Sequence, residues 1–306
     1  MKIAIVGIGG VGGAVGAALA DKYPQETFFV ARGENKRIIA ENGLTLKSVK
    51  LGELNAKPAL VTDDPSTIGA VDVIFLTSKG YALIDACTQI TPMITSQTIV
   101  IPLLNGVMVS EMMEPFLPQC VVADGTIHIF SSLVSPGVVE QTAGFYSIKF
   151  GMKDGSRPVL FNALAERLNA CGIEAEVSEQ IMADSWMKFV NMCGNSVILC
   201  HYGGPAGFVR EHADWKDVGY AVLRELIAVA QAKGVTLPAD LDTHLIAQFG
   251  DLPPQSMSSL FRDLNSGKPA KETELFHIVG RLADLADATG IAVPYHKEAL
   301  EKYAGQ

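Results

Sequence analysis

Six residues near the N-terminus form the pattern in this chain that most directly indicates a ligand. Gly7-Ile8-Gly9-Gly10-Val11-Gly12 follows a G-x-G-x-x-G pattern between an apolar run at 2–6 and a stretch of small residues at 10–20. A buried strand, such a loop and a helix are together typical of a dinucleotide site. We expect Gly7 to permit the turn, Gly9 to let a pyrophosphate approach, and Gly12 to allow close packing of helix on strand. The N-terminus of the helix would offer N–H groups to the phosphates.

The same stretch could instead be a signal peptide or a membrane helix. Six glycines among the first sixteen residues make a poor apolar core for a signal peptide. No apolar run approaches the roughly 20 residues that span a bilayer. Both alternatives are therefore disfavoured, and we expect no contact with a membrane.

Polar residues follow three predicted strands, at the ends where open α/β sheets bind ligands. Arg32 follows the strand at 26–31, where NAD enzymes usually carry an acidic residue, so this cation favours the 2′-phosphate of NADP. Lys36 and Arg37 could extend the same phosphate pocket. Lys79 follows the strand at 71–77 and Asn105 the strand at 98–104, and both are candidates for contacts to cofactor or substrate. The alternatives remain open: solvated surface cations for Arg32 and Lys79, and a turn residue for Asn105.

A second polar group lies in the C-terminal half, within otherwise apolar helical patterns. Asn191 and Asn195 follow Lys188 by three and seven residues, which places the three side chains along one helical face. Ser259 lies near the start of a later helical stretch, and Glu274 lies in another. Lysine, asparagine, serine and glutamate suit the binding of a hydroxylated keto acid beside a nicotinamide. No Ser/His/Asp or Cys/His arrangement competes with them.

Composition excludes several classes of partner. The 306 residues carry 24 basic and 33 acidic side chains, a net charge of -9, which argues against nucleic acid and anionic membranes as general partners. The five cysteines include no C-x-x-C pair, so we expect reduced thiols in a cytoplasmic protein rather than a disulfide framework or a zinc site. The six histidines are scattered, and we expect no metal.

The order of predicted elements indicates an α/β protein with two domains. Strands and helices alternate up to about residue 178, which predicts an N-terminal Rossmann-like, NADP-binding domain at 1–178. Residues 126–135 and 138–150 flank Ser135-Pro136-Gly137 as a hairpin, so we expect an antiparallel flank on the parallel sheet. Beyond residue 178 only helical patterns remain, at 179–200, 213–234, 238–249, 255–264 and 271–289. These predict an all-helical substrate and catalytic domain at 179–306.

Nine segments in order give the chain a specific resemblance over nearly its whole length. It resembles the ketopantoate reductase (2-dehydropantoate 2-reductase) family. The segments are GIGGVG at 7–12, VARG at 30–33, TSK at 77–79, LLNG at 103–106, PGVVEQT at 136–142, WMKFVN at 186–191, SSLFRD at 258–263, TELFHIVG at 273–280 and GIAVP at 290–294.

The resemblance implies a reaction and a set of roles. The reaction is the NADPH-dependent reduction of 2-dehydropantoate to (R)-pantoate in pantothenate biosynthesis, with hydride transfer to the C2 ketone. Arg32 would bind the 2′-phosphate, and Lys79 and Asn105 would lie near cofactor and substrate. Lys188 would be the general acid. Ser259 and Glu274 would bind the substrate, and Glu274 could also orient Lys188.

Two segments depart from the family pattern. In the family, asparagines usually follow the lysine of W-x-K by four and eight residues, whereas Met192 and Ser196 stand there in this chain. Asn191 and Asn195 each come one residue earlier, and a local bulge or a shifted register in this helix could restore their place. The interval from Asp263 to the site glutamate is also about three residues longer than usual, so Glu272 is an alternative to Glu274.

Two other functions stay open. The first is a reductase of a different 2-keto acid on the same scaffold, which the departures favour. The second is a non-catalytic NADP-binding regulator, which would have no use for a polar Lys/Asn stripe. In either case the partner is a small molecule. A homodimer is compatible with the sequence.

Overall fold

The computed structural model describes residues 1–305, which form two compact units. The first unit comprises Met1–Leu104 and Met108–Ile181, and the second comprises Asn105–Val107 and the chain from Met182 onward. The first unit thus ends at Ile181, three residues beyond the boundary at 178 that the sequence patterns predicted. The three residues Asn105–Val107 follow a strand of the first unit, but they belong to the second unit.

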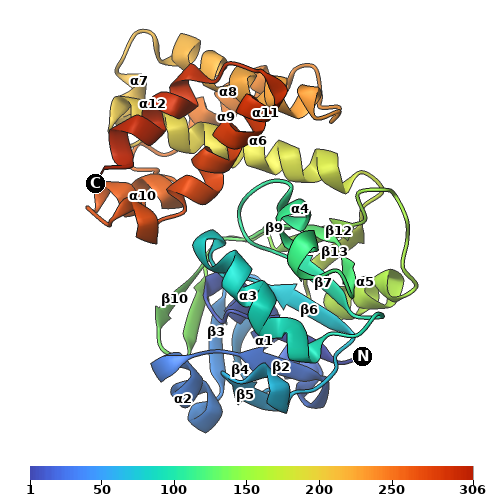
Figure 1. Cartoon of the computed structure of the whole chain (residues 1–306). Coiled ribbons are helices and arrows are strands. Elements are labelled where there is room, and N and C mark those ends of the chain that lie inside the picture. The colour runs from blue at the N-terminus through green and yellow to red at the C-terminus, as the bar shows by residue number, and fades with distance from the viewer. Residues whose placement is uncertain (306) are drawn as a thin grey trace. The chain divides into compact units, whose positions relative to one another are not determined.

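A six-stranded parallel sheet forms the core of the first unit (Figure 1). Its order is β5-β2-β1-β6-β7-β8, and every neighbouring pair is parallel. The strands are β1 (Ile3–Val6), β2 (Thr27–Val30), β5 (Leu60–Thr62), β6 (Val73–Leu76), β7 (Ile99–Pro102) and β8 (Val121–Val122). The Rossmann-like prediction is confirmed. Because the strand order reverses between β1 and β6, a ligand is expected at their carboxyl ends.

Helices cover both faces of this sheet. In β1, Ile3 and Ile5 join one buried cluster, and Ala4 and Val6 join another. Burial on both faces explains why these strands are continuous apolar runs in the sequence. The helices are α1 (Gly10–Lys22), α2 (Gly33–Asn42), α3 (Leu83–Ile90), α4 (Val109–Met113) and α5 (Leu160–Ala170), and the 3-10 turns are η1 (Pro24–Glu26), η2 (Pro65–Thr67), η3 (Gly80–Ala82), η4 (Thr91–Met93) and η5 (Glu114–Phe116).

Two smaller sheets complete the first unit and correct one expectation. The predicted hairpin around Gly137 forms, with β10 antiparallel to β11. The predicted antiparallel flank on the parallel sheet is wrong, because β11 pairs in parallel with the distant β3 and extends a separate sheet. The four-stranded sheet contains β3 (Leu44–Ser48), β4 (Gly52–Ala56), β10 (Ser131–Ser135) and β11 (Val138–Gln141), and the three-stranded sheet contains β9 (Asp124–His128), β12 (Ser147–Gly151) and β13 (Glu174–Val177).

The second unit is helical, as the periodicity predicted. Its helices are α6 (Ile181–Tyr202, whose first residue closes the first unit), α7 (Ala206–Arg210), α8 (Trp215–Ala232), α9 (Leu241–Asp251), α10 (Ser259–Asn265), α11 (Arg281–Thr289) and α12 (Pro294–Tyr303). The stretch expected as one helix at 271–289 divides into a 3-10 turn η6 (Ala270–Glu272), a π-helix η7 (Phe276–Gly280) and α11. Single π-helical turns are frequent at functional sites.

A buried carboxylate holds the start of α12 against α8. Glu225 of α8 accepts hydrogen bonds from the backbone N–H of Tyr295 at 3.0 Å and from that of His296 at 3.3 Å. It also lies 2.6 Å from Nδ1 of His296, whose side chain is fully buried. Burial lowers the pKa of His296, although the Glu225 carboxylate opposes this. Nδ1 of His296 faces the Glu225 carboxylate, which can only accept, so the imidazole is the donor in this contact.

We expect Glu225→Ala to lower the free energy of unfolding by about 2–4 kcal/mol, because three donors would lose their acceptor in the interior. Urea denaturation would measure the loss. Glu298→Ala on α12 is the matched control, since Glu298 forms only an exposed pair with His201 and should cost at most about 1 kcal/mol. Equal losses for the two variants would contradict a special role for Glu225.

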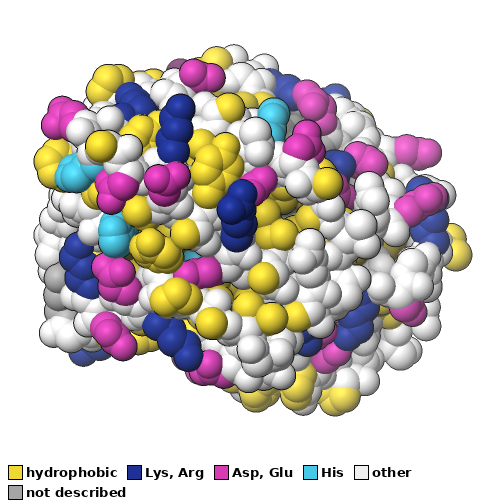
Figure 2. Space-filling view, turned by 90° about the horizontal axis from the view of Figure 1, so that it is seen from above, with side chains coloured by type: hydrophobic (Ala, Val, Ile, Leu, Met, Phe, Trp, Pro, Cys, Tyr) yellow, Lys and Arg dark blue, Asp and Glu magenta, His cyan; other side chains and the backbone are white. Residues whose placement is uncertain are grey.

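Three features of the described residues bear on membranes, charge and metals. Among residues 1–305, no helix has both the length and the hydropathy needed to cross a bilayer. Figure 2 shows acidic and basic side chains interspersed over the face that it draws. In the same part of the chain, no group of three His, Cys, Asp or Glu side chains is placed to hold a metal ion.

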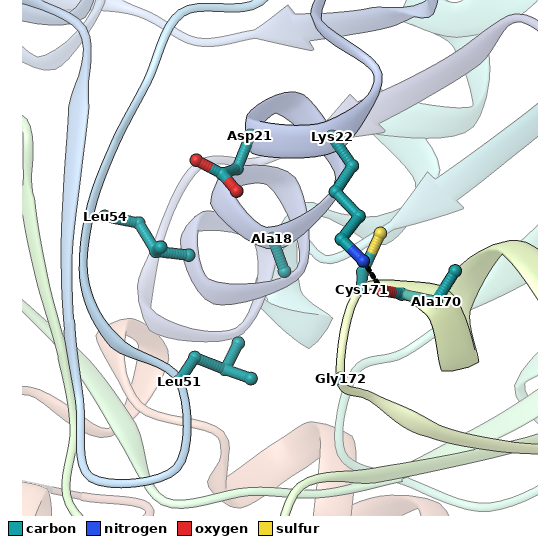
Figure 3. A pocket seen from close by; sticks show the side chains of 8 residues that line it. All are labelled: Ala18, Asp21, Lys22, Leu51, Leu54, Ala170, Cys171 and Gly172. Atoms are coloured by element: carbon teal, nitrogen blue, oxygen red, sulfur yellow. Dashed lines mark hydrogen bonds between the residues drawn. The ribbon is translucent and has the colours of Figure 1, made fainter.

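A pocket of about 280 Å³ lies in the first unit beside the C-terminal turn of α1 (Figure 3). Leu51 and Leu54 line one side, and Ala170 and Cys171 line another. Lys22 donates a hydrogen bond to the Ala170 carbonyl at its edge. The pocket contains none of the site residues predicted from the sequence.

Candidate functional site

The glycine loop has the geometry that its sequence pattern requires. Gly7 has a φ of 97°, a left-handed conformation that favours glycine. A Cβ at Gly12 would lie 2.2 Å from the Gly7 carbonyl oxygen, so only glycine lets α1 begin this close to β1. A Cβ at Gly9 would meet nothing within 4 Å, which leaves open space beside the loop. The first-turn N–H groups of α1 thus lie next to a loop that a phosphate can approach.

The end of β6 contacts the glycine loop. Thr77 Oγ1 lies 2.9 Å from the Val6 carbonyl oxygen and 2.7 Å from that of Gly7, to which it donates. The backbone nitrogen of Ser78 lies 2.9 Å from the position that a Gly7 Cβ would take. Ser78 Oγ is buried and has no hydrogen-bond partner among the described residues. Lys79 follows as an exposed residue at the carboxyl end of the sheet. Ser78 is therefore an unsatisfied polar group beside the loop that the sequence did not single out.

The three cations near the end of β2 have different partners. Arg32 is exposed and donates to the side-chain oxygen of Gln89 at 2.6 Å. Lys36 forms an ion pair with Asp63, and Arg37 forms ion pairs with two glutamates of its own helix. Lys36 and Arg37 are therefore paired with carboxylates, whereas the hydrogen-bond partner of Arg32 is a neutral amide. Besides the hydrogen bond from Lys36, the charge of Arg32 lies near enough to the Asp63 carboxylate to lower the pKa of that group, but Arg32 forms no ion pair with it.

A hydrogen-bonded chain joins three of the predicted residues within the second unit. Lys188 of α6 donates from Nζ to Asn105 Oδ1 at 3.3 Å. Asn105 Nδ2 donates to Glu274 Oε2 at 3.4 Å. Burial lowers the pKa of Lys188 to about 8, and the nearby Glu274 carboxylate opposes part of this shift. An amide that accepts from an ammonium and donates to a carboxylate orients both groups.

His277 belongs to the same cluster, although the sequence analysis did not select it. Its side chain is 7% exposed and lies in η7, three residues after Glu274. The imidazole hydrogen-bonds the Asn105 backbone, and its Nε2 is buried without a partner among the described residues. Burial lowers its pKa, which keeps the ring neutral. The spacing of three residues from Glu274 was the available signal.

Asn191 and Asn195 of α6 remain one residue before the positions that the asparagines usually have in the family. α6 continues as an unbroken α-helix through Lys188 and Asn195, with no bulge. Asn195 Nδ2 donates to Asn191 Oδ1 at 2.8 Å, so the two amides pair with each other. Met192 and Ser196 keep the positions one and two turns after Lys188.

Ser259 and Glu272 are more exposed than Ser258 and Glu274, which lie one and two residues from them. Ser259 is exposed and makes no side-chain hydrogen bond within the described chain. Ser258 caps α10 by accepting from the Phe261 N–H, and its Oγ lies 2.9 Å from Ser196 Oγ on α6. Glu272 is exposed in η6, whereas Glu274 is 5% exposed and contacts Asn105. The geometry thus groups Ser258 with α6 and Glu274 with Lys188.

Comparison with known protein families identifies the family to which this chain belongs. One family model, ketopantoate reductase PanE/ApbA, matches residues 3–155, and a second, ketopantoate reductase PanE/ApbA C terminal, matches residues 180–303. These models describe oxidoreductases of the 2-dehydropantoate 2-reductase type. The chain belongs to the ketopantoate reductase PanE/ApbA family.

Individual relatives are distant but match over most of their length. The chain is 27% identical over 294 residues to the uncharacterized oxidoreductase YkpB of Bacillus subtilis, covering 96% of this chain and 95% of the relative. It is 26% identical over 306 residues to the 2-dehydropantoate 2-reductase of Mesorhizobium japonicum, covering 94% and 93% of the two chains.

Solved structures share the fold. The ketopantoate reductase family structure from Ralstonia eutropha superposes with a TM-score of 0.86 at 25% identity, covering 98% of this chain and 96% of that one. A D-mandelate dehydrogenase in complex with NADH and anilino(oxo)acetate gives the same TM-score of 0.86 at 22% identity, covering 100% and 97%.

Proposed function

We propose that this oxidoreductase reduces 2-dehydropantoate to (R)-pantoate with NADPH, the reductive step of pantothenate biosynthesis. The observation that carries the proposal is the Lys188–Asn105–Glu274 hydrogen-bonded chain, whose ammonium has a pKa of about 8. Family membership and the 2-dehydropantoate 2-reductases among the relatives support the substrate. The five cysteines are all unpaired, which supports a cytoplasmic location.

The glycine loop and its surroundings fit a dinucleotide. Gly7-Ile8-Gly9-Gly10-Val11-Gly12 and the N–H groups of α1 would hold the pyrophosphate, with Arg32 at the 2′-phosphate. Lys79 and Asn105 stay the contacts to cofactor that the sequence predicts. The open space at Gly9 and the unsatisfied Ser78 Oγ support this fit. When bound, NADPH supplies the hydride for the C2 ketone.

The residues of the second unit supply the proton and the substrate contacts. Lys188 donates a proton to the oxygen of the ketone as it becomes an alkoxide, and its positive charge stabilises that oxygen beforehand. Asn105 holds the ammonium in place, and Glu274 accepts a hydrogen bond from the substrate hydroxyl or orients Lys188. Asn191, Asn195 and Ser259 are the remaining predicted substrate contacts, and Ser258 joins them as a candidate because it reaches α6.

A pH profile would test the acid. Because Lys188 must be protonated to donate, kcat/KM should fall about tenfold per unit above pH 8. Glu274→Gln removes the carboxylate that favours the charged amine, so the alkaline limb should move to lower pH. A limb that stays in place in this variant would contradict the coupling between Glu274 and Lys188.

The reaction itself is tested by NADPH oxidation, followed as the loss of near-ultraviolet absorbance of the reduced nicotinamide. We expect the highest kcat/KM with 2-dehydropantoate within a panel of branched and straight 2-keto acids. If kcat/KM is higher with another keto acid of the panel, the protein is still a reductase, but 2-dehydropantoate is not its substrate.

The second candidate is a reductase of a different 2-keto acid. Met192 and Ser196 favour it, because an apolar side chain stands one turn after Lys188, where the family usually carries an amide. A keto acid without a hydroxyl would leave no polar group unpaired beside Met192.

A further inference from the structure

Asn35 connects the glycine loop to another part of the first unit. It lies in the first turn of α2, and its Nδ2 donates to the carbonyl oxygen of Ile8 at 2.7 Å. Its Oδ1 accepts from the backbone N–H of Gly137 at 2.8 Å. One amide side chain thus joins the loop after β1 to the turn of the β10–β11 hairpin.

The same hairpin packs directly on the loop and on α1. A Cβ at Gly10 would lie 2.5 Å from the Ser131 carbonyl oxygen of β10, and a Cβ at Gly13 would lie 2.5 Å from the Val139 side chain of β11. Gly10 and Gly13 are therefore required by the hairpin. The loop touches the hairpin on this side, whereas the position beside Gly9 stays open.

The Asn35 contact fixes the direction of one peptide group in the loop. The Ile8 carbonyl oxygen is directed at Asn35 Nδ2, so its negative end is held by a donor. A free carbonyl in this loop could turn toward the bound phosphates and repel them. Since the Gly9 N–H bonds the Gly7 carbonyl and the Gly13 N–H bonds the Gly9 carbonyl, the N–H groups of Gly10, Val11 and Gly12 remain for an anion.

We propose that Asn35 is a positioning residue for the dinucleotide pyrophosphate, acting by fixing the Ile8 peptide against the β10–β11 turn. The proposal rests on the proposed use of NADPH and goes beyond it, because neither the glycine pattern nor Arg32 requires a polar residue at position 35. Asn35 does not touch the reacting atoms. It should therefore affect the binding of the whole dinucleotide and leave the chemical step alone.

The test measures the Kd of NADPH by fluorescence titration without keto acid. Asn35→Ala should weaken NADPH about tenfold, the equivalent of one lost hydrogen bond that organises the loop. Asn35→Asp should weaken it further, because the variant keeps the acceptor for the Gly137 N–H but replaces the donor to Ile8 with a negative charge. kcat at saturating NADPH should stay near the wild-type value for both variants.

Two controls separate positioning from simple stabilisation. Asn42→Ala changes an exposed asparagine at the other end of α2 and should leave the Kd unchanged. The affinity for 2′-AMP, which carries the 2′-phosphate without a pyrophosphate, should be the same in wild type and in both Asn35 variants.

Three results would overturn the proposal: an unchanged NADPH Kd with a lower Tm, an equal loss of affinity for 2′-AMP, or a fall in kcat alone. If Asn35→Ala does not fold, Asn35→Asp still tests the Ile8 contact, because it retains the Gly137 contact. Tight NADPH binding without reduction of any keto acid would refute the proposed reaction while leaving the Asn35 test intact.

Discussion

Lys188→Ala is expected to lower kcat by at least about a hundredfold while NADPH binds almost as in the wild type. The variant removes the proton donor and also the positive charge that stabilises the alkoxide. Steady-state kinetics with 2-dehydropantoate would give kcat, and fluorescence titration would give the Kd of NADPH. The two measurements separate the chemical step from cofactor binding.

Controls for this variant come from the same unit. Lys297→Ala removes an exposed lysine that pairs with Asp287 and should leave turnover unchanged. Small primary amines added to Lys188→Ala should restore part of the activity, because an ammonium ion can occupy the emptied space. Turnover at the wild-type level in Lys188→Ala would remove the lysine from the mechanism.

Arg32→Asp is expected to weaken NADPH by about a hundredfold and NADH far less. The loss combines charge-assisted hydrogen bonds to the 2′-phosphate with repulsion from the new carboxylate. Competing titrations of the two cofactors would measure the ratio of their Kd values. The preference for NADPH over NADH, expressed as this ratio of Kd values, should fall or reverse.

Lys36→Ala is the matched control, because Lys36 is already paired with Asp63 at 2.9 Å. It should change the ratio much less than Arg32→Asp does. Equal weakening of both cofactors by Arg32→Asp would show that this side chain does not bind the 2′-phosphate. A large effect of Lys36→Ala would move the phosphate contact one turn along α2.

The sequence predicted the parallel sheet and the helical unit because their signals are local. β1 and β6 are apolar runs whose glycine or polar boundaries lie within a few residues of each strand. β11 gave no such signal for its partner, since it pairs with β3 across more than ninety positions of chain, for example Val138 with Thr45. Both strands also pack against α1, and the hairpin sequence by itself does not encode such a non-local pairing.

The same distinction holds for the candidate site. The Lys188 stripe follows from helical spacing and could be predicted, whereas the contact between Ser196 and Ser258 joins two helices 62 residues apart. The sequence selected Ser259, but the side chain that reaches α6 is that of Ser258, one residue earlier. Asn35 could not be selected from the sequence, because its role depends on the backbone of distant residues. His277 had only its spacing of three residues from Glu274 as a signal, and its contact with the Asn105 backbone depends on the fold.

Asn105–Val107 group with the helical unit although β7 precedes them in the other one. The polypeptide consequently passes from one unit to the other three times rather than once. A gene divided at residue 181 would encode a helical fragment without Asn105, in which Lys188 and Glu274 lose their bridging amide. Split versions of this enzyme would therefore have to be reassembled from both fragments before the lysine regains its partner.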